Sequence, residues 1–122
     1  MHPDSATVLD ILHAARSAVR FSVGLDKSAF LADEKTQSAV LHQLLVLGEA
    51  VKRLSTPFRV AHPELPWKMM AGMRDKVVHE YDDVDLDEVW ETLTHDAPRV
   101  IAVLEALEPR RENGPIGGSP AT

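Results

Sequence analysis

The 122-residue sequence contains no cysteine, and aromatic residues make up only 5% of it. Without cysteine, the chain can form neither disulfides nor thiolate metal sites, and it has no cysteine nucleophile. No apolar run approaches the length of a membrane span, and the amino terminus lacks a basic and then apolar signal segment. We therefore expect a cytoplasmic protein that does not associate with membranes.

The alternating pattern of polar and apolar residues that is typical of strands is also missing, and apolar residues recur instead at helical steps of three and four. Hydrophobic residues make up 44% of the chain, which is enough for one compact core. Three stripes are Val8, Ile11, Leu12, Ala15 and Val19; Val40, Leu44, Leu47, Val51 and Leu54; and Met69, Met70, Met73 and Val77. We predict an all-α fold, an up-and-down bundle of four to five helices, in residues 1–108.

Capping residues and prolines predict where the helices begin and end. The expected starts are Asp4 or Ser5, Asp33, Pro66 as a first helical residue, and a capping box of Asp85 with Glu88. The second long helix should end near Ser55, and short helical turns are expected at Ser28 to Leu31 and at Pro57 to His62. The fourth long helix should run from Leu86 to Leu107, with Val89, Leu93, Val100, Val103, Leu104 and Leu107 inward and a kink at Pro98.

Residues 109–122 differ in composition from the rest of the chain. They are rich in Gly and Pro and lack apolar periodicity. We expect them to form a disordered tail.

Charge is distributed unevenly along a chain whose net charge is -6. Between Ala50 and His79, six Lys or Arg residues stand against two carboxylates, whereas Glu80 to Asp96 contains eight carboxylates and no Lys or Arg. The acidic total is unfavourable for an RNA enzyme, because cationic side chains neutralise RNA phosphates. The basic segment could nevertheless form a phosphate-binding strip; the plainer interpretation is two differently solvated helix faces.

Arg74, His79 and Tyr81 form the most informative motif of the chain, an arginine followed after four residues by a histidine and then, one residue later, by a tyrosine. A guanidinium can hold a phosphate through paired hydrogen bonds, and an imidazole can move a proton near neutral pH. The motif resembles that of the HEPN superfamily, specifically the HepT-like toxin ribonucleases. Leu47-Gly48-Glu49-Ala50, Pro66-Trp67 and Gly72-Met73-Arg74 resemble segments of the same family.

This resemblance implies a metal-independent endoribonuclease toxin of a HEPN/MNT toxin-antitoxin system, in which Arg74 and His79 are catalytic. Asp75, Lys76 and Tyr81 would bind or orient the RNA substrate. Tyr81 would also be the O-AMP-tyrosine site, modified by a cognate MNT-type nucleotidyltransferase antitoxin. No cofactor is implied for the chain itself, because the ATP is used by the antitoxin.

Helix geometry constrains how the motif could work. On an ideal helix, Arg74 and His79 point about 140° apart and lie about 7.5 Å apart along the axis. Either the helix loosens near His79, or another helix surface completes the site. The resemblance implies a homodimer whose motif residues line a shared cleft.

Each motif residue also has a structural interpretation without catalysis. Arg74 could pair with Asp75, Glu80 or an acidic residue of another helix. His79 could be a partly exposed polar residue, and Tyr81 could be a core aromatic with its hydroxyl at the surface. The six histidines form no repeated constellation with carboxylates, so no metal site is expected. An alternative function is a non-catalytic helical module that binds a nucleotide or a protein.

Overall fold

The structure, a computed structural model, describes residues 4–107, and these contain helices and no strand. Their bounds are α1 Ser5–Phe21, α2 Lys27–Leu31, α3 Glu34–Lys52, α4 Thr56–Ala61, α5 Trp67–His79, the 3-10 turn η1 Tyr81–Asp83, α6 Leu86–Glu91, the π-helical segment η2 Thr92–Asp96, and α7 Ala97–Leu107. The prediction of an all-α fold is confirmed. Residues 1–3 and 108–122 lie outside the described part, and with them lies the expected tail.

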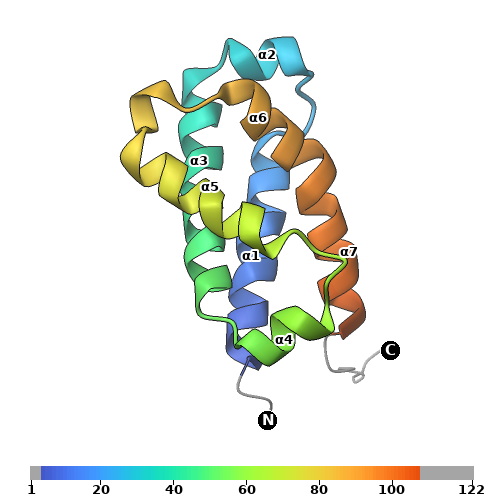
Figure 1. Cartoon of the computed structure of the whole chain (residues 1–122). Coiled ribbons are helices and arrows are strands. Elements are labelled where there is room, and N and C mark those ends of the chain that lie inside the picture. Colours follow the sequence, from blue (N-terminus) through green and yellow to red (C-terminus); the bar gives the residue numbers. More distant parts are fainter. Residues whose placement is uncertain (1–3, 108–122) are drawn as a thin grey trace, which may run out of the picture.

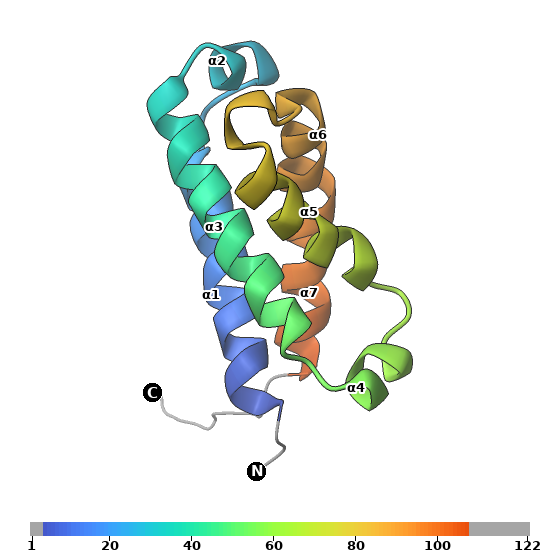
Figure 2. The same ribbon diagram turned by 60° about the vertical axis from the view of Figure 1, so that its left-hand side comes forward.

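The long helices run alternately up and down (Figures 1 and 2). Helix α1 packs against both α3 and α7, and α5 packs against α3. Helices α6 and α7 form one continuous rod through η2. The short helix α4 lies at one end of the bundle, beside the start of α5. Helix α5 makes its main contact with α3, and its buried Met70, Met73 and Val77 belong to the core of the bundle.

The core consists largely of the stripes that the sequence predicts. Burial of these side chains removes apolar surface from water, which is the main force that holds the helices together. Buried members include Ile11, Leu12, Val40, Leu44, Leu47, Val51, Met70, Met73, Val77, Val89, Leu93, Val100 and Leu104. The prediction that Leu107 points inward is wrong, because 43% of that residue is exposed at the end of α7.

Two of the predicted caps have different outcomes. Asp33 caps α3 as predicted, accepting a hydrogen bond from the backbone N–H of Thr36 at 3.1 Å. Helix α1 begins at Ser5 with Asp4 at the N-cap position, as predicted, but the Asp4 side chain makes no capping hydrogen bond. Its carboxylate instead accepts hydrogen bonds from the backbone N–H of Ser55 at 2.9 Å and from the Ser55 hydroxyl at 2.7 Å. The prediction of a side-chain cap by Asp4 is therefore wrong, since a residue distant in the sequence competes for the carboxylate.

Other boundaries shift by a few residues. Helix α3 ends at Lys52 instead of near Ser55, and α5 begins at Trp67, one residue after Pro66. The two predicted short turns are present as α2 and α4. At the start of α6, the Asp85 carboxylate accepts from the N–H groups of Asp87 and Glu88. The carboxylate of Glu88 bonds Lys76, so the reciprocal half of the capping box is replaced by an ion pair.

Pro98 changes the helix around it in the way that its chemistry requires. Proline has no N–H to donate to the carbonyl of Thr94, four residues earlier. The preceding segment η2 is π-helical, and the N–H of Ala97 bonds the carbonyl of Thr92, five residues back. The structure thus has a π-helical segment directly before the proline, while the kink at Pro98 stays a prediction.

Candidate active site

Helices α3 and α5 approach each other most closely where Gly48 faces Arg74. A Cβ atom added to Gly48 would lie 2.4 Å from the Cβ of Arg74 and 2.9 Å from the carbonyl oxygen of Met70. Real Cβ atoms do not tolerate such contacts, so only glycine fits here without movement of α5. Gly48 thus allows the backbone of α5 to lie directly on α3 and brings Arg74 next to the polar edge of α3.

Arg74 lies within a cluster of charged side chains from both helices. Its Nε is 3.0 Å from Glu49 Oε1, and its Nη1 donates to Asp75 Oδ1 at 3.1 Å. Lys52 Nζ donates to the same Asp75 oxygen at 2.6 Å. The hydrogen bond to Asp75 raises the pKa of Arg74 further above its ordinary value. The hydrogen bonds from Lys52 and Arg74 lower the pKa of Asp75.

The cluster therefore holds a permanently charged guanidinium in a fixed position between two carboxylates. Its side chain keeps 27% of its surface exposed, so it remains accessible to a ligand. Asp75 itself is bonded to Arg74, its neighbour in the sequence.

His79 is the last residue of α5, and its side chain is exposed. Among residues 4–107, no hydrogen-bond or ion-pair partner holds its imidazole. The helix is regular up to His79, so the separation of about 140° from Arg74 persists in one copy of the chain. Loosening of α5 does not bring the two side chains together. The other option, a wall supplied by a second copy, stays a prediction.

Tyr81 follows α5 in the turn η1, and 48% of the residue is exposed. Its hydroxyl donates to Ser38 Oγ on α3 at 3.3 Å. The interpretation of Tyr81 as a core aromatic is wrong, because half of its surface faces solvent. The ring is instead tethered across the outside of α3, with the hydroxyl oxygen near the surface.

Lys76 points toward α6 and away from Arg74. Its ammonium bonds both carboxylate oxygens of Glu88, at 3.0 and 2.8 Å. The hydrogen bond to Glu88 raises the pKa of Lys76. A substrate contact by Lys76 would have to compete with this ion pair.

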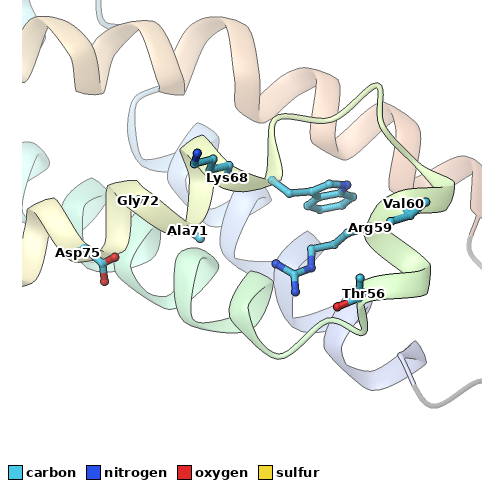
Figure 3. Close-up of a pocket in the computed structure, with 8 residues that line it drawn as sticks. Thr56, Arg59, Val60, Lys68, Ala71, Gly72 and Asp75 are labelled. Atoms are coloured by element: carbon cyan, nitrogen blue, oxygen red, sulfur yellow. The ribbon is translucent and has the colours of Figure 1, made fainter.

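An open groove lies between α4 and α5 (Figure 3). We call it the α4–α5 groove. It has a volume of about 680 Å³ and is lined by Thr56, Arg59, Val60, Trp67, Lys68, Ala71, Gly72 and Asp75. Asp75 connects the groove to the Arg74 cluster. The groove and the motif therefore share one helix.

Sequence analysis alone assigns no role to four residues that the structure places around the motif. Gly48, Glu49 and Lys52 lie on α3 against Arg74 and Asp75, and Ser38 lies on α3 against Tyr81. The available signal was the Gly48-Glu49 pair within an otherwise apolar helical stripe. A glycine inside a helix often marks a close approach by another backbone, and a neighbouring carboxylate is then placed to meet a cation.

Two further properties concern membranes and metals. No helix within residues 4–107 combines the length and the hydropathy needed to cross a bilayer. In the same part of the chain, no three His, Asp or Glu side chains are grouped so that they could hold a metal ion.

Comparison with known proteins identifies relatives over nearly the whole described region. The family described as "Ribonuclease HepT-like" matches residues 11–107. "Probable ribonuclease HepT" from Thermococcus cleftensis is 40% identical over 98 residues, covering 80% of this chain and 89% of the relative. "Putative RNase MJ0127" from Methanocaldococcus jannaschii is 36% identical over 102 residues, covering 84% of each protein. No solved structure matches the chain significantly.

Proposed function

Because this chain belongs to the ribonuclease HepT-like family, we propose that it is an endoribonuclease whose active site is built on Arg74 and His79. The observation that carries the proposal is the pair itself: an arginine side chain that is 27% exposed and an imidazole without a partner among residues 4–107, both on one helix inside the segment that matches the family. Relatives that share a third or more of the sequence carry ribonuclease names.

The proposed reaction uses the RNA as its own nucleophile. The 2′-hydroxyl of the ribose attacks the adjacent phosphorus, the bond to the 5′-oxygen of the next nucleotide breaks, and the products carry a 2′,3′-cyclic phosphate and a 5′-hydroxyl. His79 serves as general base toward the 2′-hydroxyl or as general acid toward the leaving oxygen. Arg74 stabilises the negative charge that develops on the phosphate oxygens. The reaction needs no metal ion.

A homodimer would solve the geometric problem that one copy presents. Arg74 and His79 leave α5 in different directions, so one copy offers the substrate either group but not both at once. Two copies that meet along their α5 helices would line one cleft with both kinds of side chain. The exposed apolar surface of Val78, 44% exposed beside His79, favours α5 as the contact.

Tyr81 is the proposed control point. A nucleotidyltransferase antitoxin of the MNT type would transfer AMP from ATP to this residue. The Tyr81 oxygen bonds the α-phosphorus of ATP, pyrophosphate leaves, and the phenolic proton passes to a base. The residue is half exposed, and its hydroxyl makes one long hydrogen bond to Ser38, so the oxygen is accessible. An attached phosphate and purine would obstruct RNA near His79 and compete for Arg74.

We propose accordingly that the protein acts in a toxin-antitoxin system of the cytoplasm, with RNA as substrate. Asp75 keeps Arg74 oriented, and Lys76 contacts RNA if its ion pair with Glu88 opens.

A second candidate is a non-catalytic helical module that binds a nucleotide or a protein. The specific observation in its favour is that Glu49 and Asp75 both engage Arg74, so that the guanidinium already has anionic partners. The net charge of -6 points the same way.

Cleavage assays on the purified chain separate the two candidates. We expect the parent to cut single-stranded RNA in the presence of EDTA, and we expect Arg74→Ala and His79→Ala each to lower the rate by at least about 100-fold. Circular dichroism should show an unchanged helical content for both variants. If the parent leaves RNA intact but binds it, the non-catalytic module is the correct function.

A further inference from the structure

The basic segment between Ala50 and His79 contains six Lys or Arg residues, and the structure divides them into two groups. Four have carboxylate partners: Lys52 with Asp75, Arg53 with Asp10, Arg74 with Glu49 and Asp75, and Lys76 with Glu88. Arg59 and Lys68 have no ion-pair partner among residues 4–107. Their positive charge is therefore the part of the segment that is free to meet an external anion.

Both free cations line the same feature, the α4–α5 groove (Figure 3). The Arg59 side chain reaches from α4 toward α5, and Lys68 lies along α5. The Nε atom of Arg59 is buried and has no hydrogen-bond partner within residues 4–107. A buried donor without an acceptor is costly, so an anion that bonded this guanidinium would remove an existing penalty as well as supply an attraction.

The α4 wall of the groove is held in place from two sides. Ser55, which caps α4 through its hydroxyl, is bonded to the buried Asp4 carboxylate at the start of α1. On the other side, Trp67 Nε1 donates to the carbonyl of His62 at 2.9 Å. Arg59 therefore projects from a helix that is fixed relative to α5, which reduces the entropy lost when a ligand binds.

The groove is aligned with the proposed catalytic histidine. Lys68, Gly72, Asp75 and His79 follow one another at steps of four, three and four residues, which places them within an arc of about 60° on α5. A Cβ at Gly72 would meet nothing within 4 Å, so the glycine leaves this stripe open. A chain that lies along the groove is therefore directed to His79.

In the part of the chain that the structure describes, Asp75 is the only carboxylate that lines the groove, and it would repel a phosphate if it were unpaired. Lys52 and Arg74 both donate to its Oδ1. Its charge is thereby balanced, and the uncompensated charge of the groove is positive.

From these observations we propose that the α4–α5 groove is a subsite for the backbone of single-stranded RNA beside the cleaved bond, and that Arg59 and Lys68 bind a phosphate there. The proposal rests on the ribonuclease function proposed above, because it takes RNA as the ligand. The rise from Lys68 to His79 along α5 is about 16 Å, which corresponds to about five nucleotides at the 3.4 Å spacing of a stacked strand. A dinucleotide should be too short to occupy both places.

Binding of a fluorescent 12-nucleotide single-stranded RNA, measured by anisotropy in EDTA, tests the subsite without requiring cleavage. We expect Arg59→Gln with Lys68→Gln to weaken binding by at least about 10-fold. The slope of log K against log salt should fall by about 0.7 for each phosphate contact that is lost. Arg53→Gln is the matched control, because it removes a cation of the same segment that is paired outside the groove; its binding should stay within twofold of the parent.

Substrate length gives a second readout. The double variant should raise KM for the 12-nucleotide RNA and leave cleavage of a dinucleotide unchanged. If the parent cleaves RNA and the double variant binds the longer RNA as tightly as the parent does, the subsite is wrong. An equal loss of binding in Arg53→Gln would also overturn it, since the effect would then reflect total charge. If the parent binds through Arg59 and Lys68 but cleaves nothing, the subsite stands and the ribonuclease proposal fails.

A steric variant tests the groove without changing charge. Gly72→Gln places a side chain into the open stripe, whereas Gly72→Ala adds one methyl group. We expect the glutamine to weaken binding of the 12-nucleotide RNA by at least about threefold and the alanine to leave binding unchanged. If Gly72→Gln binds like the parent, RNA does not enter the groove. Lys68→Gln alone, at an exposed position, provides a variant that folds even if Arg59→Gln does not.

Discussion

Gly48 of α3 lies so close to Arg74 of α5 that a Cβ on the glycine would be 2.4 Å from the Cβ of the arginine. The contact decides where the guanidinium can be, because α5 rests on α3 at this point. The structure thus makes the position of the proposed phosphate-binding group depend on the absence of a side chain one helix away.

Gly48→Ala should therefore destabilise the protein and lower its rate of RNA cleavage. Alanine gains about 1 kcal/mol of helix propensity, but overpacking against Arg74 and the Met70 carbonyl costs about 1–3 kcal/mol. We expect a net loss of about 1 kcal/mol in the free energy of unfolding and a lower rate of RNA cleavage. Gly72→Ala is the matched control on α5, where the added methyl meets open space. Its free energy of unfolding should rise by about 0.5–1 kcal/mol. Denaturant titration of both variants measures the change in free energy of unfolding. A change of the same sign in both would contradict the prediction.

Asp75 should give the stability of the protein a recognisable dependence on pH. The hydrogen bonds from Lys52 and Arg74 lower its pKa in the folded state below the ordinary 3.8. A lowered carboxylate pKa stabilises the fold above pH 3.8, and that contribution disappears as the pH falls through the folded-state value. In urea titrations, the free energy of unfolding of the parent should exceed that of Asp75→Asn above pH 4. We expect this difference to shrink as the pH falls below 4. A difference in free energy of unfolding that stays constant from pH 7 to pH 2 would show that the ionised Asp75 carboxylate is not its cause.

The main helices and their core faces could be predicted from local patterns. The stripe from Val40 to Val51 is buried because residues three and four apart share one helix face, and Asp33 caps that helix through its own neighbour Thr36. The missing N–H of Pro98 is likewise a property of the residue itself, and a π-helical segment precedes it.

Features that depend on other helices could not be predicted in this way. Aspartate is a residue type that often caps helices. The carboxylate of Asp4 nevertheless accepts hydrogen bonds from Ser55, which only the fold brings close. The basic segment offered six equivalent cations in the sequence, and only tertiary pairing distinguishes Arg59 and Lys68 from the others. Sequence spacing likewise singled out Arg74 and His79 as candidates, but it could not show that Glu49 on α3 pairs with Arg74.

Self-association is the next prediction. If two copies meet along α5, Val78→Asp should weaken the dimer, because it places a charge in an apolar contact beside His79. Val60→Asp is a matched control, since Val60 is also exposed but lies on α4. Sedimentation at micromolar concentration should show a dimer for the parent and for Val60→Asp, and mainly monomer for Val78→Asp. A parent that sediments only as a monomer would remove the dimer from the mechanism.

Tyr81→Phe should separate silencing from cleavage. The variant loses the hydroxyl that bonds Ser38 and would accept AMP, but it keeps the ring. After incubation with ATP and the nucleotidyltransferase, mass spectrometry should place the added AMP on the Tyr81 peptide of the parent and none on the variant. Nuclease activity should fall only in the parent. Equal silencing of both proteins, or AMP found only on other peptides, would show that control acts elsewhere.

The most direct test of the central claim is the chemical identity of the RNA ends produced in EDTA. If Arg74 and His79 promote attack by the ribose 2′-hydroxyl, mass spectrometry of the upstream product should show a 2′,3′-cyclic phosphate. A substrate with a 2′-deoxynucleotide at the cleaved position should remain intact at that bond, and His79→Ala should yield no product at the same protein concentration. Upstream products ending in a 3′-hydroxyl, or cleavage by His79→Ala at the parental rate, would contradict the account.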